Sequence, residues 1–218
     1  MVIFSNDADI LKYEPILFGE LHLSWQVVAA GAGGTLSGTT FTASEADFVA
    51  SWVAPGGVIY LQSADGSLDG PYEIVSVDSA TQLTVSVIRP DAQAAPVAPP
   101  AATDISWRIS TFGPQANEVG FQLTEYFGIA PGNPASEIDA QDVLDASVLR
   151  LASVFAVISI AYAMLAGKAR NENYWKKSLH YQKLFAEARG RCRLSIDTGS
   201  DGLADVTKVG ASGRLVRD

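Results

Sequence analysis

Residues 57–88 read GVIYLQSADGSLDGPYEIVSVDSATQLTVSVI and contain three short runs rich in β-branched and aromatic residues. The runs lie at 57–62, 72–77 and 82–88, and Asp-Gly, Asp-Gly-Pro and Asp-Ser-Ala-Thr segments separate them. β-branched and aromatic residues favour strands, whereas Asp and Gly between such runs favour turns. We therefore expect three consecutive strands in this part of the chain.

More strands are expected on both sides of this block. Residues 22–29 and 39–42 precede it, with the glycine-rich segment GAGGTLSG (31–38) as a connection, and residues 107–111 follow it. About six short strands within roughly 90 residues predict a small antiparallel β barrel or sandwich. The proline-rich segment DAQAAPVAPPAA (91–102) predicts an exposed extended loop, either a passive surface excursion or an arm that contacts a neighbouring subunit.

The periodicity becomes helical after Phe112, and we expect helices at about 114–127, 145–167 and 171–189. The second helix repeats apolar residues every three or four positions and carries small residues on its opposite face. The apolar positions are Val148, Leu151, Phe155, Ile158, Tyr162 and Leu165, and the small residues are Ala152, Ala156 and Ala163. Its uncharged part would span about 25 Å, short of the roughly 30 Å hydrocarbon core of a bilayer, so we predict a helix buried in protein.

The order of these elements predicts the architecture. A short helix or turn, capped by Asn6 or Asp7, precedes the strands, and three helices follow them. We therefore expect an α+β protein in which a bundle of about three to four helices carries an inserted small antiparallel β barrel or sandwich and an extended C-terminal arm. The expected parts are 1–20 (N-terminal helix or turn of the helical core), 21–113 (β-rich module), 114–192 (helical bundle) and 193–218 (C-terminal strand and arm).

Residues for catalysis or metal binding are scarce. One cysteine, Cys192, and two histidines, His22 and His180, exclude a disulfide scaffold and leave little for zinc or acid–base chemistry. We expect His22 to be hydrogen-bonded in a strand and His180 to be solvated, and we expect neither enzymatic activity nor a cofactor. The segment from Asp197 to Asp205 resembles the start of a calcium loop, but lysine stands at the twelfth position, so an Asp-Gly turn is favoured and calcium stays open.

Charge is distributed unevenly along the 218 residues, whose formal charge is −9. Residues 1–145 hold three basic and eighteen acidic side chains, a balance of −15, whereas residues 146–218 hold twelve basic and six acidic ones, a balance of +6. The third helix is the basic element. Because the acidic part would repel a polyanion, we favour a subunit contact over nucleic-acid binding for this helix.

The second half of the chain resembles a known family. It contains, in order, DVLDASVLRLASVFAVISIAYAMLAG, a basic helix with a tryptophan in NENYWKKSLHYQKLFAEARG, an Arg-Leu-Ser-Ile-Asp strand, an Asp-Gly-Leu-Ala-Asp turn and a closing Arg-Leu-Val-Arg. Over residues 114–218 this order resembles the head-tail connector, or adaptor, proteins of tailed bacteriophages and related gene transfer agents. The order of the motifs carries the resemblance.

The resemblance implies a structural virion protein, assembled in the host cytoplasm. Such adaptors form a homo-oligomeric ring, commonly a dodecamer, in the neck between the capsid portal protein and the tail or a stopper or terminator protein. Genomic DNA would pass through the ring without sequence-specific binding, and no membrane is involved. On this basis we assign a partner interface to Lys176, Lys177, Lys183, Arg189, Arg191 and Arg193, and to Arg214, Leu215, Val216 and Arg217 in the tail.

A different class of function stays open. The β module could be a binding or decoration module, for example a carbohydrate-binding accessory, with the helices as an oligomerisation stem. Exposure of aromatic side chains on the module would favour this alternative, and burial of all of them would weaken it. The aromatic residues concerned are Trp25, Trp52, Tyr60 and Tyr72.

Overall fold

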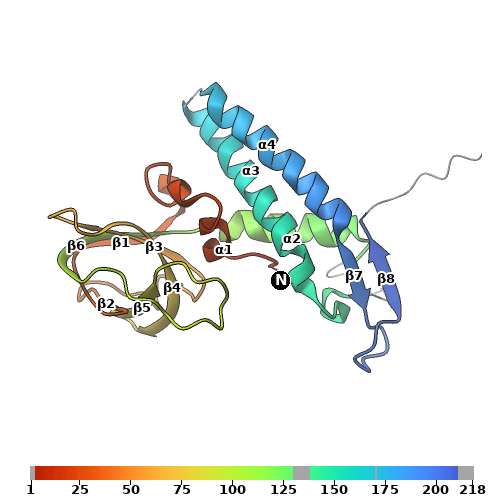
Figure 1. The fold of residues 1–218 in the computed structure, drawn as a ribbon, viewed down its shortest axis with the longest axis horizontal. Helices are drawn as coiled ribbons and strands as arrows, with labels where there is room; N and C mark the ends of the chain where they lie inside the picture. The colour runs from red at the N-terminus through yellow and green to blue at the C-terminus, as the bar shows by residue number, and fades with distance from the viewer. Residues whose placement is uncertain (1–2, 130–137, 170, 211–218) are drawn as a thin grey trace, which may run out of the picture. The chain divides into compact units, whose positions relative to one another are not determined.

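The computed structural model describes residues 3–129, 138–169 and 171–210 (Figure 1). The chain forms two compact units. The barrel unit is Asn6–Gly113, and the helical unit combines Met1–Ser5 with Pro114–Asp218. The α+β class and the small antiparallel barrel predicted from the sequence are confirmed.

The barrel unit contains the short helix α1 (Asp7–Leu11), the 3₁₀ turns η1 (Pro15–Leu17) and η2 (Ser24–Gln26), and six strands. The strands are β1 (Val27–Ser37), β2 (Thr40–Thr42), β3 (Val58–Ser63), β4 (Asp69–Ser79), β5 (Gln82–Ser86) and β6 (Ala102–Ser110). All neighbouring strands are antiparallel, in the order β1-β2-β5-β4-β3-β6, and β6 pairs with β1. The sheet is therefore a closed barrel and not a sandwich, and it leaves no edge strand.

Aromatic rings fill the centre of the barrel. The Trp107 ring meets Phe48 and Phe41 edge to face, with centroid separations of 5.3 and 6.1 Å. Aliphatic side chains from the other five strands complete this core, and β2 contributes Phe41. The aliphatic side chains include Leu36, Ile59, Leu61, Ile74, Leu83, Val85, Ile105 and Ile109. Removing this apolar surface from water is the main stabilising contribution to the unit.

The glycine-rich segment 31–38 lies almost entirely within β1, which corrects its prediction as a connection. A Cβ atom at Gly31 would lie 2.8 Å from the Trp107 ring, and one at Gly34 would lie 2.6 Å from the Phe41 ring. The core rings thus occupy the space that a side chain would need. The register between β1 and β6 also shifts in this segment, as is typical where glycine lets a strand bend.

Two further predictions for the barrel unit were wrong. The first strand begins at Val27, and His22 lies outside any strand, directly after a turn, with its Nδ1 atom 3.0 Å from the Gly19 carbonyl oxygen. Residues 69–71 belong to β4 and not to a turn. At this end β4 pairs with β3 only, so Pro71 removes no hydrogen bond to β5.

The N-terminal helix belongs to the barrel unit from Asn6 onward, although the sequence predicts the first twenty residues to be part of the helical core. Asn6 caps α1, as predicted. The Ala8 N–H donates to the Gly56 carbonyl at 2.8 Å, and the Asp7 carboxylate accepts the Phe112 N–H at 2.7 Å. These long-range hydrogen bonds attach the helix to the barrel, and neither is visible in the local sequence.

The proline-rich segment 91–102 is held by one buried arginine. The Arg89 guanidinium donates to the carbonyl oxygens of Ala92 and Ala94 at 3.1 and 2.8 Å, and it pairs with the Glu73 carboxylate at 2.7 Å. Both charged side chains are 8% exposed. Because these bonds tie the start of the loop to its own barrel, they favour the passive loop over the arm.

The helical unit contains α2 (Gly113–Tyr126), whose first residue ends the barrel unit, the 3₁₀ turns η3 (Ala140–Asp142) and η4 (Ala146–Leu149), α3 (Arg150–Ala169), α4 (Glu172–Arg191), β7 (Arg193–Ile196) and β8 (Val206–Val209). α3 and α4 form an antiparallel hairpin, and α2 crosses behind it (Figure 1). The three predicted helices are thus confirmed. Gly167, the predicted stop of the second helix, has helical backbone, and α3 continues to Ala169.

The segment Ala146–Lys168 is long and apolar enough to cross a membrane by length and composition. The protein itself covers 61% of its most apolar stretch. Within the helical unit, the buried Ser153 hydroxyl of α3 hydrogen-bonds to the Ser5 hydroxyl at 2.7 Å. This burial agrees with the prediction of a helix packed in protein.

The C-terminal part is a packed hairpin over most of its length. β7 and β8 form a two-stranded antiparallel sheet, and Leu194 and Ile196 of β7 are completely buried. Ile196 also bridges to Val143. The predicted C-terminal strand is thus confirmed as β7, and the extended arm predicted after it is wrong for residues 197–210, because β8 pairs with β7. The predicted arm residues at 211–218 lie outside the described part of the chain.

Candidate assembly interface

Serine and tyrosine side chains join the two helices of the α3–α4 hairpin. The Ser159 and Ser178 hydroxyls each donate to the other residue's carbonyl oxygen at 2.9 Å. The Tyr162 ring stacks on Tyr181 with an interplanar angle of 11°. Hydroxyl-to-backbone bonds of this kind require the helix axes to lie close together, so the two helices pack tightly where these residues meet.

Two of the cations that were predicted to form a partner interface instead contact aromatic rings of the helical unit. The Lys177 ammonium donates to the Tyr162 hydroxyl at 2.9 Å and lies 4.7 Å from the centre of that ring. The Arg189 guanidinium lies 4.0 Å from the centre of the Tyr126 ring of α2 and 4.9 Å from that of Phe185. Cation–π contacts account for both positions without an external partner.

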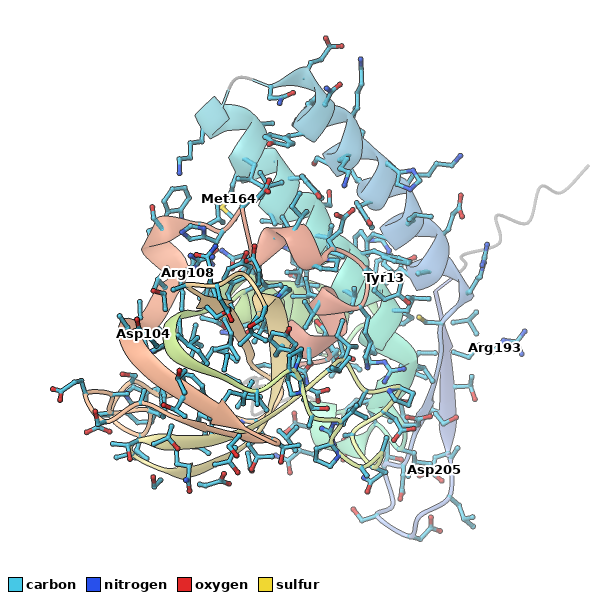
Figure 2. All side chains as sticks on the ribbon, turned by 60° about the vertical axis from the view of Figure 1, so that its left-hand side comes forward. Tyr13, Asp104, Arg108, Met164, Arg193 and Asp205 are labelled. Carbon is cyan, nitrogen blue, oxygen red and sulfur yellow. The ribbon has the colours of Figure 1, made fainter. Side chains whose placement is uncertain are left out.

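Four other predicted cations extend into solvent. Lys176 pairs with Glu172 at 3.0 Å, and Arg191 pairs with Glu187 at 3.7 Å, but these side chains are largely exposed and such pairs stabilise little. Lys183 and Arg193 make no ion pair within the described part of the chain, and Figure 2 shows Arg193 extending away from β7.

The tail residues predicted as interface lie outside the described residues. They are Arg214, Leu215, Val216 and Arg217.

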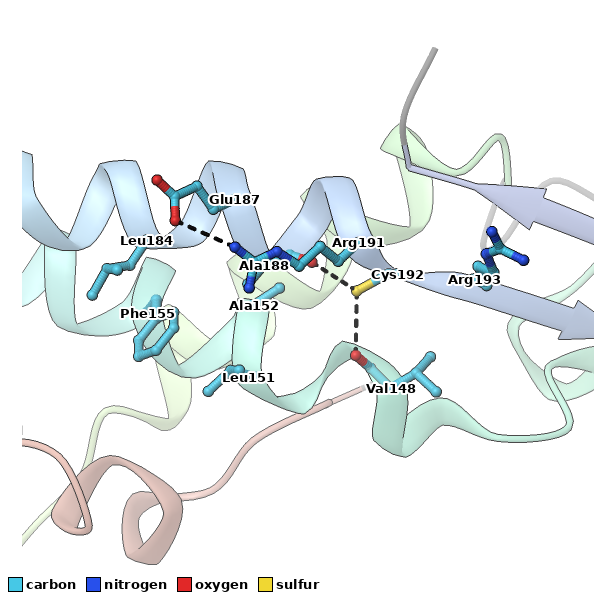
Figure 3. A pocket seen from close by; sticks show the side chains of 10 residues that line it. All are labelled: Val148, Leu151, Ala152, Phe155, Leu184, Glu187, Ala188, Arg191, Cys192 and Arg193. Carbon is cyan, nitrogen blue, oxygen red and sulfur yellow. Dashed lines mark hydrogen bonds and ion pairs between the residues drawn. The ribbon is translucent and has the colours of Figure 1, made fainter. Parts of the chain in front are cut away.

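An apolar pocket of about 410 Å³ opens between the start of α3 and the end of α4 (Figure 3). Apolar side chains of both helices line it, and charged side chains stand at its edge. The lining residues are Val148, Leu151, Ala152, Phe155, Leu184, Ala188 and Cys192, with Glu187, Arg191 and Arg193 at the edge. We call this set the hairpin pocket.

The hairpin pocket exists because small residues face each other near this end of the hairpin. Ala152 and Ala188 line it from opposite helices and leave space that larger side chains would fill. Val148 and Leu151, which the sequence predicts to be buried, are 36% and 43% exposed beside this space. The alanines of α3 were the sequence signal for close helix contact, but the pairing with Ala188 depends on the register of the hairpin.

Cys192 contributes to the pocket as an apolar group. Its thiol donates to the carbonyl oxygens of Val148 and Ala188 at 3.2 and 3.3 Å (Figure 3). Burial raises the pKa of the Cys192 thiol, whereas the neighbouring arginines would suggest a lowered pKa from sequence. A buried, protonated thiol is poorly nucleophilic, so Cys192 belongs to the packing of the site.

Exposed tryptophans mark the surface of the barrel unit. Trp52 is 91% exposed and Trp25 is 57% exposed, whereas Tyr60 and Tyr72 are half-buried. The four residues are therefore not all buried. Burial of all four would have weakened the alternative of a binding or decoration module, so that alternative stays open.

The charge of the chain divides differently between the units than along the sequence. The barrel unit carries three basic and twelve acidic side chains, a balance of −9, and the helical unit carries twelve of each. The basic face of α4 is offset by acidic residues of its own unit outside that helix. The acidic surface thus belongs to the barrel unit.

The turn from Asp197 to Asp205 uses its carboxylates internally. Asp205 accepts the Thr198 hydroxyl and the N–H groups of Gly199 and Thr198, all at 2.9 Å, and these bonds lower its pKa. Asp197 accepts the Gly202 N–H at 2.6 Å. Over the residues that the structure describes, no group of three or more His, Cys, Asp or Glu side chains is placed to hold a metal ion. These bonds favour the Asp-Gly turn over the calcium loop.

Comparisons with protein-family models, with curated proteins and with solved structures found no match for this chain.

Proposed function

We propose that this protein is a structural adaptor of a tailed bacteriophage that assembles as a ring in the virion neck. The ring would join the portal protein to the tail or a stopper protein and extend the DNA channel. The observation that carries the proposal is the hairpin pocket, an apolar recess with exposed Val148 and Leu151 next to the cations Arg191 and Arg193. Exposed apolar surface with a polar rim is typical of protein interaction sites.

The two units supply different surfaces for a ring. In a head-to-tail ring, one face of each subunit must complement a different face of the next. An acidic barrel unit and a helical unit with solvent-exposed cations meet this requirement. We infer that α2 completes a bundle with the α3–α4 hairpin, since Arg189 of α4 lies over Tyr126 of α2.

Acidic residues also suit a channel through which DNA must move. Tight DNA binding depends on neutralising phosphates with Lys and Arg. The barrel unit has only three basic residues, Lys12, Arg89 and Arg108, and Arg89 is buried in its pair with Glu73. DNA would therefore pass this unit without being held.

Binding to the portal protein of the same virus tests this proposal. The full-length chain is mixed with purified portal protein, and co-sedimentation is measured. We expect a complex, and we expect a chain that ends at Gly210 to lose binding while its circular dichroism spectrum stays unchanged. This truncation keeps β7, whose Leu194 and Ile196 are buried, and its partner strand β8. A chain that stays monomeric and ignores the portal would contradict the proposal, and unchanged binding of the truncated chain would contradict the role of the tail.

A second function, a binding or decoration module with a helical stem, is favoured by one observation. Trp52 and Trp25 are exposed on the barrel unit, as such a module requires. Titration of the full-length chain with oligosaccharides, followed by tryptophan fluorescence, tests it. Saturable quenching that disappears in the Trp52→Ala variant would support this function, and an unchanged signal across the glycans would remove it.

A further inference from the structure

We propose that the barrel loop 43–57 of one copy docks into the hairpin pocket of a second copy, with the Trp52 indole as its apolar anchor. The inference rests on the proposed ring function and names the contact that joins neighbouring subunits. It draws on two features that lie in different units, an exposed loop held by hydrogen bonds and an unfilled recess.

The loop presents Trp52 in a fixed position. Trp52 is 91% exposed and has φ +57°, a left-handed conformation that a bulky residue adopts only where its surroundings impose it. The Val53 N–H donates to the Phe48 carbonyl at 3.0 Å, and the Ala50 N–H donates to the Asp47 carboxylate at 2.8 Å. Phe48 itself is buried in the barrel core. The backbone that carries the indole is thus fixed by hydrogen bonds, and a preorganised backbone lowers the entropy cost of binding.

The loop that carries this anchor also carries two exposed carboxylates. Glu45 and Asp47 are exposed on the same loop, Val49 beside them is 61% exposed, and residues 43–57 contain no Lys or Arg. The loop therefore exposes apolar and negatively charged side chains together. It belongs to the acidic unit of the chain, so the wider surface has the same sign.

The hairpin pocket has the complementary chemistry. Its walls are aliphatic and aromatic, and its volume of about 410 Å³ lies within the range of sites that take a ring-sized group. Arg191 and Arg193 stand at its edge, and the Arg191 side chain is 81% exposed and only loosely paired with Glu187 at 3.7 Å. Arginine is well suited to bind carboxylates at such an edge.

A second copy of the chain is the occupant that this complementarity favours. Every copy carries both the loop and the pocket, so the contact is head to tail and repeats from one subunit to the next. Such a contact closes into a ring when the rotation between neighbours allows it. Trp and Arg are also the residue types most often found to dominate the energetics of protein interfaces.

Sedimentation equilibrium of the full-length chain, alone and with the portal protein, tests the contact. We expect Trp52→Ala and Arg191→Glu each to raise the dissociation constant between copies at least about tenfold. Both side chains are largely exposed, so we expect neither change to disturb the fold, which circular dichroism checks. Trp25→Ala is the matched control, an exposed tryptophan elsewhere on the barrel unit, and is expected to change association less than about twofold.

A charge exchange makes the test specific. Glu45→Arg combined with Arg191→Glu restores the opposite signs, and we expect it to recover most of the association that Arg191→Glu loses. Trp52→Ala and Arg191→Glu variants that assemble like the wild type would overturn the contact while leaving the ring proposal intact. A wild-type chain that neither self-associates nor binds the portal would instead overturn the proposed function itself.

Discussion

The Asp7 carboxylate is buried between the start of α1 and the segment that follows β6. Burial raises its pKa from 3.8 to about 6, although the hydrogen bonds from the Phe112 N–H and Thr111 act in the opposite direction. Because the pKa is higher in the folded than in the unfolded chain, this group favours folding at low pH. The advantage is complete below about pH 3.8 and is lost as the pH rises through about 6.

We therefore predict that Asp7→Asn stabilises the protein at neutral pH. The amide oxygen can still accept the Phe112 N–H, and the cost of a buried charge is removed. Urea unfolding between pH 4 and 7 should show equal stabilities near pH 4 and a gain that grows to about 1–3 kcal/mol at pH 7. Parallel stability profiles for the variant and the wild type would argue against this reading of Asp7.

The Arg89–Glu73 pair gives a second prediction at this scale. Removing one partner leaves the other buried charge uncompensated, so we expect Glu73→Gln to destabilise the protein by roughly 3 kcal/mol. The double variant Glu73→Leu with Arg89→Met removes both charges and should recover more than half of that loss. Urea unfolding at pH 7 measures both, and a double variant less stable than Glu73→Gln would show that the ion pair is not the cause.

At the scale of the element, the cations of the α3–α4 hairpin are of two kinds: some bond to side chains of the fold, and others form only exposed ion pairs or none within the described part of the chain. Lys177 bonds to Tyr162, which is fully buried, whereas its neighbour Lys176 forms only an exposed pair with Glu172. We predict that Lys177→Ala lowers the free energy of unfolding by about 1–2 kcal/mol. Lys176→Ala, the matched control, should cost less than about 0.5 kcal/mol. Equal effects in thermal or urea unfolding would contradict this division.

The sequence predicted the elements better than their ends and contacts. The periodicity of the apolar residues and the positions of the turn residues were sufficient to predict the six barrel strands and the three helices, because these two signals are local properties of the sequence. The prediction for segment 31–38 was wrong because its glycines leave space for the rings of Trp107 and Phe41, which are distant in sequence. The position of Lys177 was missed for the same reason, since its partner Tyr162 lies on the other helix of the hairpin.

At the scale of the whole molecule, the division into two units changes the meaning of the charge pattern. Along the chain the pattern is an acidic first part and a basic second part, but the units hold balances of −9 and zero. The hairpin pocket was not predictable, because it depends on which residues of α3 and α4 face each other. The basic sequence around its arginines led to the prediction that they form an interface, which stays a prediction, whereas the exposure of Trp52 depends on the conformation of its loop.

The central claim is that copies of this chain assemble into a ring. Negative-stain electron microscopy of the purified full-length protein, alone and bound to the portal protein of the same virus, tests it most directly. We predict closed rings of uniform subunit number, which the Trp52→Ala variant forms less readily than the Trp25→Ala control. The claim would be contradicted if the protein alone stays as single subunits and if, in large excess over the portal protein, it adds no ring to the portal.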